Sequence, residues 1–511
     1  MNIFLLAPIF ISFLAGLALL VWSFREKRTP SSHKTEAKPW PARTLFLSAL
    51  SLSALCTVFC SLKVTGSVVL FHLFSKLPIA LSLDSLGRFF VLTVTLIWVV
   101  VGFYSITYLT REGEEKRFFG FFLLLYGVLY CLGCSQNLVT MYLFYELMSL
   151  TSFPLVLHNG SREAIMASLK YLFYSMCGAY MGLFGIFVLY HTLPDLGFVA
   201  GGSASQALLS QGDGLLPVAI LIMLLGFSVK AGMFPLHAWL PTAHPVAPSP
   251  ASAALSGIIV KCGVLAIIRV MYYIIGPSAL QGSFLLTVLQ SLSLITVFMG
   301  SLLAFREKVF KKRLAYSTVS QVSYILFGLF IVTPQGVQGA LLHLLFHAIV
   351  KCGLFLTAGV FLYSFGYTRV DQLQGVGKKM PVTLWCYTFF ALALVGIPPT
   401  CGFLSKWYLA QGAFASTAGV FRFLGPVILL VSALLTAGYL LPITMDGFFV
   451  TKETTVHADK PCEPSLWMLI PLLILALLTL GLGLFPNAIL SFTQSLSDSL
   501  FQTVSTLFII R

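Results

Sequence analysis

The stretch FSVKAGMFPLHAWLPTAHPVAPSP, residues 227–250, places one lysine, two histidines and five prolines directly behind the apolar run LPVAILIMLLGF. Pro235 follows Lys230 by five residues, and proline removes a backbone hydrogen bond, so the pattern predicts that a helix breaks here. A break at membrane depth is tolerated where it lines a cavity or is shielded by protein. A lysine in such a place is hidden, paired or functional.

The composition indicates a membrane protein. Of 511 residues, 58% are hydrophobic and 9% are charged, whereas a soluble domain has about a quarter charged residues. Long apolar runs recur along the chain, and about 20 helical residues cross a bilayer core. We therefore predict an all-α polytopic membrane protein, with Met1–Ser23 as a retained first helix because it lacks a basic leader and a cleavage site. The sequence predicts fourteen spans, at residues 2–23, 44–64, 87–108, 118–135, 138–157, 165–190, 215–240, 250–274, 284–304, 314–332, 337–365, 382–410, 421–447 and 466–487.

The net charge of +14 is concentrated in alternate loops. Of 31 Lys and Arg residues, 20 fall in these loops and five on the opposite side of the predicted membrane. This asymmetry predicts that the basic loops are cytoplasmic and that both termini lie outside, in an inner (cell) membrane. Because basic loops are the ordinary topogenic signal, the charge does not indicate a nucleic-acid partner. The basic loops are residues 24–43, 109–117, 158–164, 305–313, 366–381 and 448–465.

Six basic residues remain inside the predicted spans. A lysine at the centre of a spanning helix costs about 2.5–3.5 kcal/mol on insertion scales, so several of them are hard to explain by packing alone. Arg269 lies near a span end, where its side chain can snorkel. The others are deeper: Lys170, Lys230, Lys261, Lys351 and Lys406.

Glu146 is the only carboxylate between Glu115 and Glu163, and it lies near the middle of its span. One interpretation is a static buried ion pair with Lys230 or Lys170 that fixes helix packing. The other is a switchable pair whose separation changes the proton affinity of the lysine. The additional buried lysines favour the second interpretation.

The segment HLLFHAIVKCG places His343, His347 and Lys351 on one helix face, because they are spaced four residues apart. Imidazole titrates near neutral pH and can pass protons. A zinc site is disfavoured, because no Cys or acid nearby completes a ligand set. The preceding span carries a row of hydroxyls, from Tyr316 to Tyr324, which either bonds helix to helix or holds a chain of waters.

A second proline-interrupted segment, VGIPPTCGFLSKWYLA, contains Pro398, Pro399 and Lys406. Two interrupted, lysine-bearing helices in the two halves of one chain suggest paired repeats. Five spans per unit make the copies inverted in topology. We therefore divide the chain into N-terminal helices (1–117), a first five-helix repeat (118–274), a second, inverted repeat (284–447) and a C-terminal helix and tail (448–511).

The stretch FPLHAWLPTAHPVAPSPASAALSGIIVKCGVLAIIR resembles the signature of the antiporter-like subunits of respiratory complex I, group 4 membrane-bound hydrogenases and Mrp-type sodium/proton antiporters. The segment RLAYSTVSQVSYILFG, the His343–Lys351 row and the Glu146 span match this family in order and spacing, over roughly residues 85–450. The resemblance implies fourteen helices with two inverted five-helix repeats. It also implies partner membrane subunits, including further antiporter-like ones.

The resemblance assigns ion-translocating roles to buried residues of this chain. It implies a Glu146–Lys230 pair, a central Lys261, the His343–Lys351 row and an exit-side lysine, Lys406. A lysine at this last position departs from the complex I subunit type that has glutamate there, and from these 511 residues we expect no long lateral helix like that of the largest complex I subunit. We expect the ion-translocating set to be Glu146, Lys170, Lys230, His237, Lys261, His343, His347, Lys351 and Lys406.

Three classes of function follow. The first is a proton- or sodium-pumping, non-catalytic subunit of a redox-driven complex, in which another subunit carries the redox arm. The second is a subunit of an Mrp-type antiporter. The third, a transporter of an organic solute, is the weakest, because the polar residues form a titratable chain rather than a substrate-sized cluster. With ten scattered Cys and no nucleotide-binding motif, we expect no cofactor in this chain.

Overall fold

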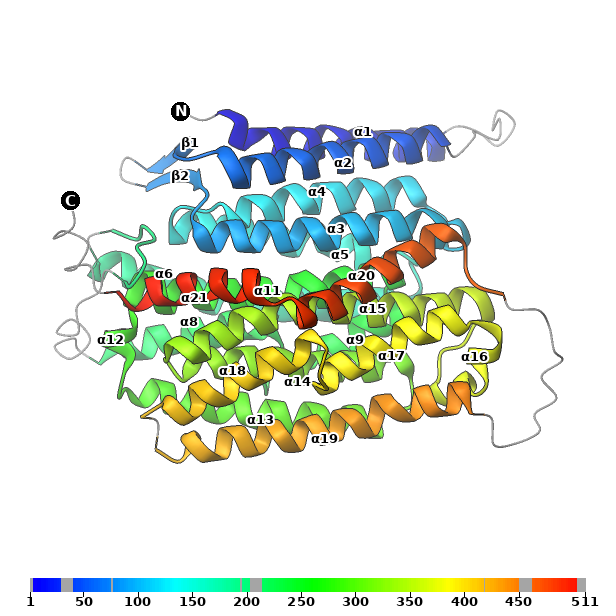
Figure 1. Ribbon diagram of the computed structural model, residues 1–511. Helices are drawn as coiled ribbons and strands as arrows, with labels where there is room; N and C mark the ends of the chain where they lie inside the picture. Colours follow the sequence, from blue (N-terminus) through cyan, green and yellow to red (C-terminus); the bar gives the residue numbers. More distant parts are fainter. Residues whose placement is uncertain are drawn as a thin grey trace.

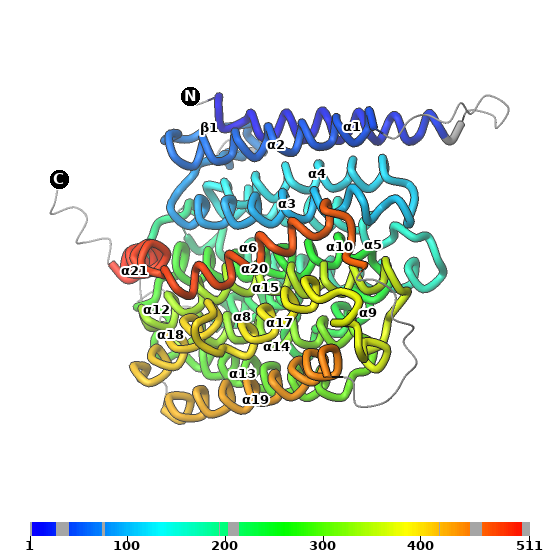
Figure 2. Tube along the Cα trace, turned by 45° about the vertical axis from the view of Figure 1, so that its right-hand side comes forward, coloured from blue at the N-terminus to red at the C-terminus, as the bar shows by residue number. Residues whose placement is uncertain are grey.

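The computed structural model describes residues 3–28, 40–74, 77–193, 195–202, 214–417, 419–449 and 462–502. Helices α1 (Ala7–Arg28) and α2 (Trp40–Lys63) lie at one edge of the molecule, and α13 (Phe284–Arg306) and α19 (Phe421–Phe448) lie at the opposite edge (Figures 1 and 2). Within the described residues, eleven helices are long and apolar enough to cross a membrane. The predicted helical membrane architecture is confirmed.

The N-terminal part contains a β-hairpin that the sequence reading did not anticipate. After η1 (Ile3–Leu6), α1 and α2, the antiparallel strands β1 (Ser67–Phe74) and β2 (Leu77–Ser82) precede α3 (Ser85–Glu112) and α4 (Glu115–Gly133). Ser82 N–H donates to the Cys134 carbonyl at 2.6 Å and fixes the hairpin to the end of α4. Asp84 caps α3, because its side chain accepts from Gly87 N–H at 2.9 Å.

The middle of the chain starts with two regular helices and continues with shorter pieces. Asn137 and Ser161 cap the regular helices, α5 (Leu138–Val156) and α6 (Arg162–Thr192). The pieces that follow are α8 (Leu215–Ala231), α9 (Leu240–Val246), α10 (Ser249–Ala254), the π-helical η3 (Leu255–Ile259), α11 (Val260–Ile268), the π-helical η4 (Arg269–Ile275) and α12 (Pro277–Leu280).

The last part again combines long and interrupted helices. After α13 come α14 (Phe310–Phe330), α15 (Pro334–Phe365), η5 (Val370–Leu373), α16 (Val376–Lys379), α17 (Pro381–Val395), α18 (Cys401–Ala415), α19, α20 (Leu466–Leu484) and α21 (Asn487–Phe501). The segments Ser249–Ile275 and α15 are buried throughout their most apolar stretches, so they form the centre of the molecule.

Both predicted helix breaks are present. α8 ends at Gly232, which has φ 78°, and α17 ends at Gly396, which has φ 92°. This left-handed conformation is readily adopted only by glycine. Pro235 lies between α8 and α9, and Pro398 and Pro399 lie between α17 and α18. The break after Lys230 therefore begins three residues before the proline that predicted it.

Each of the fourteen predicted spans coincides with a helix or an interrupted helix. α8 and α17 are shorter apolar helices because each is one piece of an interrupted span. α14 is less apolar, since it begins with Lys311, Lys312 and Arg313 and continues with hydroxyl residues. Fourteen crossings, the inverted repeats and the four chain divisions remain predictions.

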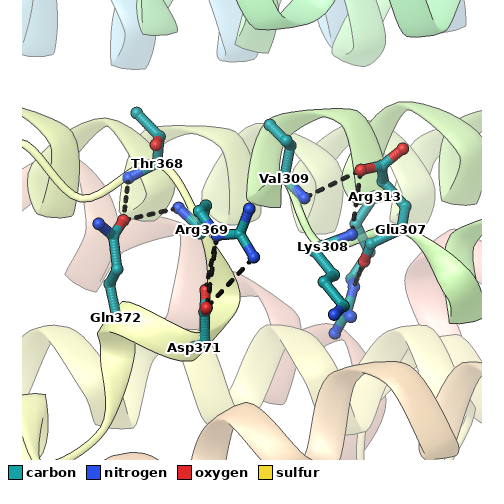
Figure 3. Close-up of polar contacts among 8 residues, drawn as sticks. All are labelled: Glu307, Lys308, Val309, Arg313, Thr368, Arg369, Asp371 and Gln372. Atoms are coloured by element: carbon teal, nitrogen blue, oxygen red, sulfur yellow. Dashed lines mark hydrogen bonds and ion pairs between the residues drawn. The ribbon is translucent and has the colours of Figure 1, made fainter.

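The loops predicted to be basic lie at one end of the helices. Loops 305–313 and 366–381 join through backbone hydrogen bonds, Phe310 N–H to Thr368 O at 2.8 Å and Val370 N–H to Lys308 O at 3.0 Å. Figure 3 shows the side chains at this junction. Two ion pairs join loops 24–43 and 109–117: Arg43 with Glu115 and Lys116 with Glu26, each at 2.6 Å. Residues 29–39 and 450–461 of two basic loops lie outside the described residues.

Candidate functional site

Lys230 lies at the end of α8 with 1% of its side chain exposed. Its ammonium donates to Ser149 Oγ at 2.9 Å, Tyr171 OH at 3.1 Å and Ser175 Oγ at 2.8 Å. The Tyr171 ring also lies 4.5 Å from Nζ. Hydroxyl dipoles and an aromatic face therefore replace water around this cation.

Glu146 is half-buried on α5, one turn before Ser149, and accepts a hydrogen bond from Tyr142 OH at 3.1 Å. Among the residues that the structure describes, no ion pair joins Glu146 to Lys230 or to Lys170. The static ion pair is therefore not formed in this conformation. The switchable pair stays a prediction.

Two further predicted residues lie around the first half of the site. Lys170 is half-buried on α6, directly before Tyr171. His237 lies between α8 and α9, and its buried Nδ1 has no hydrogen-bond partner among the described residues. Neither side chain contacts Lys230 through a hydrogen bond in the described part of the chain.

Lys261 lies on α11, between the two π-helical segments, and is completely buried. Its amine contacts His347 Nδ1 at 2.6 Å and donates to the carbonyl of Ser256. π-Helical turns are rare overall, but those that occur often lie at functional sites. α11 also packs closely on α8, because a Cβ on Gly263 would lie 3.1 Å from the Cβ of Lys230. The two lysine-bearing helices are therefore direct neighbours.

The predicted row on α15 is confirmed as one buried face. The rings of His343 and His347 are 5.9 Å apart, and the Lys351 amine donates to Leu314 O at 2.9 Å. His343 Nδ1 lies 2.9 Å from Ser405 Oγ on α18. Nε2 of each histidine is buried without a partner among the described residues, so each ring keeps one nitrogen free for a proton or a water.

Lys406 follows Ser405 on α18 and reaches back across the second break. Its amine donates to Leu394 O at 2.6 Å and Val395 O at 2.8 Å, the last carbonyls of α17. A cation is stabilised at a helix C-terminus by the helix dipole. Because Lys406 Nζ also lies 5.2 Å from the Tyr324 ring, which stacks on His343, this lysine adjoins the α15 row.

The hydroxyl row of α14 bonds helix to helix. Ser320 Oγ contacts Ser301 Oγ on α13 at 2.8 Å, and Tyr324 OH donates to Leu429 O on α19 at 2.7 Å. Ser320 and Tyr324 therefore take part in helix packing, and the chain of waters stays a prediction. Gln321 is different, because both polar atoms of its side chain are buried without a partner in the described structure.

Sequence reasoning missed two buried basic residues near the row. His244 on α9 is fully buried, stacks on Phe355 of α15 at 4.6 Å, and has no hydrogen-bond partner for either ring nitrogen within the described residues. Lys311 is 8% exposed and donates to Ala247 O at 2.9 Å. His244 could have been selected as the second histidine of the stretch 227–250; Lys311 was counted as a loop charge.

Comparison with known proteins identifies the family of the chain. The family model described as NADH:quinone oxidoreductase/Mrp antiporter, TM, matches residues 135–444. The chain is 32% identical over 415 residues to NADH-quinone oxidoreductase subunit N of Desulforudis audaxviator, covering 77% of this chain and 81% of that protein. It is 31% identical over 430 residues to hydrogenase-4 component B of Escherichia coli, covering 80% of this chain and 63% of that protein.

A chain of the Mrp complex from Dietzia sp. has the same fold. The two superpose with a TM-score of 0.82 at 22% sequence identity, covering 99% of both chains. The match extends beyond the region covered by the family model, so the N-terminal helices and α20 belong to the shared fold.

Proposed function

Because the chain belongs to the NADH:quinone oxidoreductase/Mrp antiporter transmembrane family, we propose that it is an ion-translocating membrane subunit of a redox-driven complex, of the NADH:quinone oxidoreductase or membrane-bound hydrogenase type. It moves protons (or sodium ions) through its buried Glu, Lys and His side chains. The contact between Lys261 and His347 carries the proposal, since an amine and an imidazole 2.6 Å apart can exchange a proton.

The proposed order follows the two interrupted helices. Glu146 and Lys230 form the loading site, with Lys170 and His237 beside it. Lys261 passes the charge to the α15 row of His343, His347 and Lys351, and Lys406 lies on the exit side. The breaks at Pro235, Pro398 and Pro399 give water access to the two ends.

Electron transfer belongs to other subunits in this proposal. The chain needs no cofactor of its own, and the energy of a redox reaction reaches it through neighbouring membrane subunits. Relatives named as an NADH-quinone oxidoreductase subunit and a hydrogenase-4 component support this assignment.

A subunit of an Mrp-type sodium/proton antiporter is the second candidate. The fold that the chain shares with a chain of the Mrp complex, at a TM-score of 0.82, is consistent with it. Both candidates use the same buried residues, and they differ in the energy source: a redox reaction in the first and an existing ion gradient in the second.

Inverted membrane vesicles containing the chain and its neighbouring subunits distinguish the two candidates. Proton and sodium uptake is measured after adding NADH or reduced methyl viologen, and separately after imposing a sodium gradient without a donor. We expect donor-driven uptake that is impaired in Lys351→Ala while the complex remains assembled. Exchange that needs only the sodium gradient would support the Mrp-type candidate. Unchanged donor-driven uptake in assembled Lys351→Ala would remove Lys351 from the mechanism.

We further propose that the basic end faces the cytoplasm of a cell membrane, with both termini outside. The basic loops hold 20 Lys and Arg residues and the opposite side holds five, and this asymmetry supports the orientation. Cysteines placed at exposed Lys308 and Arg422 test it, in a background with exposed Cys177 and Cys462 replaced by serine. An impermeant maleimide added to intact cells should label Arg422→Cys and miss Lys308→Cys; the reverse pattern would invert the assignment.

A further inference from the structure

An apolar groove runs between α3 and α20, which are neighbours on the surface of the bundle (Figure 2). Its volume is about 490 Å³, and its walls include Val99 and Phe103 from α3 and Trp467, Ile470 and Ile474 from α20. Ile470 is 49% exposed and Ile474 is 41% exposed. Because both helices are apolar enough to cross a membrane, the groove opens toward the hydrocarbon region.

The groove ends at a polar rim at the basic end of the molecule. Thr107 Oγ1 and Ser465 Oγ, which are 3.4 Å apart, lie where α3 and α20 meet. One turn further along α3, Thr110 Oγ1 lies 3.3 Å from Tyr363 OH, and the exposed Arg111 guanidinium lies 4.3 Å from the Tyr363 ring. Arg111 also donates to the Tyr363 carbonyl, so a guanidinium anchored on α15 lies beside these hydroxyls at one end of the apolar groove.

A basic loop lies beside the segment that leads into α20, which also carries the carboxylate of Glu463, bonded to Val382 N–H and Thr383 Oγ1 at 2.6 Å. The segment that leads into α20 is tied to the basic loop before α17, because Cys462 N–H donates to Lys379 O at 2.8 Å. Lys378 in this loop is exposed. Trp467, in the first turn of α20, stacks on Phe103 at 5.9 Å, and tryptophan is enriched near the ends of spanning helices, at the membrane–water interface.

We propose that this groove binds an anionic glycerophospholipid from the leaflet at the basic end. One acyl chain fills the space between α3 and α20, and the phosphate lies at Arg111 and the Thr107–Ser465 hydroxyls. Guanidinium binds a phosphate diester in a bidentate manner, and hydroxyl donors complete its coordination. A neighbouring subunit's apolar helix would fill the groove but would leave the exposed Arg111 guanidinium without the carboxylate partner that it also lacks among the described residues.

The fluorescence of Trp467 reports occupancy in the purified complex. The complex is placed in bilayers containing a small fraction of brominated phosphatidylglycerol or brominated phosphatidylcholine, and subtracting the signal of Trp467→Phe isolates the quenching of this residue. We expect the anionic lipid to be preferred by about fivefold, the effect of one basic residue near an anionic headgroup. Higher salt should reduce the preference in the unmodified protein.

Arg111→Gln should remove the preference while quenching by the zwitterionic lipid stays unchanged. Arg422→Gln is the matched control, because Arg422 also lies over an aromatic ring, at 5.5 Å from that of Phe423, but at the opposite end; it should retain the preference. Equal quenching by both lipids would reduce the groove to ordinary bilayer contact. Absence of Trp467 quenching by either lipid would show that a protein helix covers the groove. Either result overturns the proposal.

Discussion

The candidate site has two halves, one around Lys230 and one around Lys351 and Lys406, and they hold their lysines in different ways. Lys230 is surrounded by the hydroxyls of Ser149, Tyr171 and Ser175. Lys351 and Lys406 donate to backbone carbonyls. Hydroxyl groups both donate and accept hydrogen bonds, whereas carbonyls only accept. The first environment can therefore solvate an ammonium or a neutral amine, and the second fixes the position of an N–H donor.

The difference suggests a division of labour. A site that accommodates both protonation states is suited to loading and release. A row anchored by carbonyls and bridged by imidazoles, as in the Lys261–His347 contact, is suited to passing a charge along fixed positions. Variants that change charge, proton exchange or hydrogen bonding separately can test this comparison.

The largest effect is expected at Lys230. Lys230→Ala removes the amine, and Lys230→Arg keeps the charge but stays protonated at physiological pH, so ion transport should fall about 100-fold in both. Glu146→Gln should give a similar loss. Donor-driven ion uptake is measured in vesicles with the assembled complex. Lys308→Ala, at an exposed loop position, is the control.

Near-normal transport in an assembled Lys230→Arg variant would show that only the positive charge matters. Lys230 would then be a packing residue, and the comparison between the two halves would lose its functional meaning.

A smaller loss is expected in the α15 row. His347→Gln keeps a hydrogen-bonding side chain beside Lys261 but cannot take up a proton, so transport should fall about tenfold while assembly is retained. Gln321→Leu, at another buried polar residue, tests whether any polar loss in this region has the same effect. Equal transport losses in the two variants would contradict a specific role for the imidazole.

The hydroxyls around Lys230 should contribute less than the amine. Ser149→Ala combined with Ser175→Ala removes two of its three hydrogen bonds, each worth about 1.5–3 kcal/mol when the partner is charged. Water that enters the space left behind compensates part of this, so we expect a several-fold reduction in transport rate. The same paired change at Ser291 and Ser499, which bond only to their own helices, should leave the rate unchanged.

Apolar run lengths and proline positions were sufficient to predict the long apolar helices and both interruptions, but not α21, which lies in the predicted C-terminal tail. The apolar runs require helices in a bilayer, and Pro235, Pro398 and Pro399 mark where the backbone cannot continue. The β-hairpin was missed because Ser67–Phe74 and Leu77–Ser82 are too short for a span and carry no tight-turn signal among their described residues. The left-handed Gly232, rather than the proline, ends α8.

The α15 row could be predicted from its four-residue spacing, because residues spaced in this way lie on one face of a single helix. Contacts between helices could not be derived in this way. The spacing of residues does not reveal that Lys261 meets His347, that hydroxyls rather than Glu146 receive Lys230, or that His244 is buried against Phe355. These contacts depend on how distant segments pack.

The smallest effect on transport, and a clear effect on stability, is expected at an ion pair outside both halves of the site. Arg269, with 2% of its side chain exposed, forms a bidentate pair with Asp84 at 2.6 Å and 2.7 Å. Among the six basic residues of the spans, Arg269 is the one with an ion pair to a carboxylate in the described part of the chain. This pair joins the start of α3 to η4, so we expect it to hold helices together rather than carry ions.

Asp84→Asn should therefore lower the free energy of unfolding by about 2–3 kcal/mol and leave transport per assembled complex nearly unchanged. Burial raises the pKa of Asp84, but the Arg269 guanidinium and the Gly87 N–H outweigh this and hold the pKa below its usual range. A depressed pKa stabilises the folded state above the unfolded value of about 3.9, and this contribution is lost as pH falls through the folded pKa. The difference in Tm between the unmodified protein and Asp84→Asn should be constant from neutral to mildly acidic pH and shrink below about pH 4.

Asp371→Asn is the control. It breaks the exposed pair with Arg369 (Figure 3) and should show no measurable change in Tm at any pH. A Tm difference for Asp84→Asn that grows with acidity, or a large loss of transport in the assembled complex, would move this pair from the scaffold to the ion pathway.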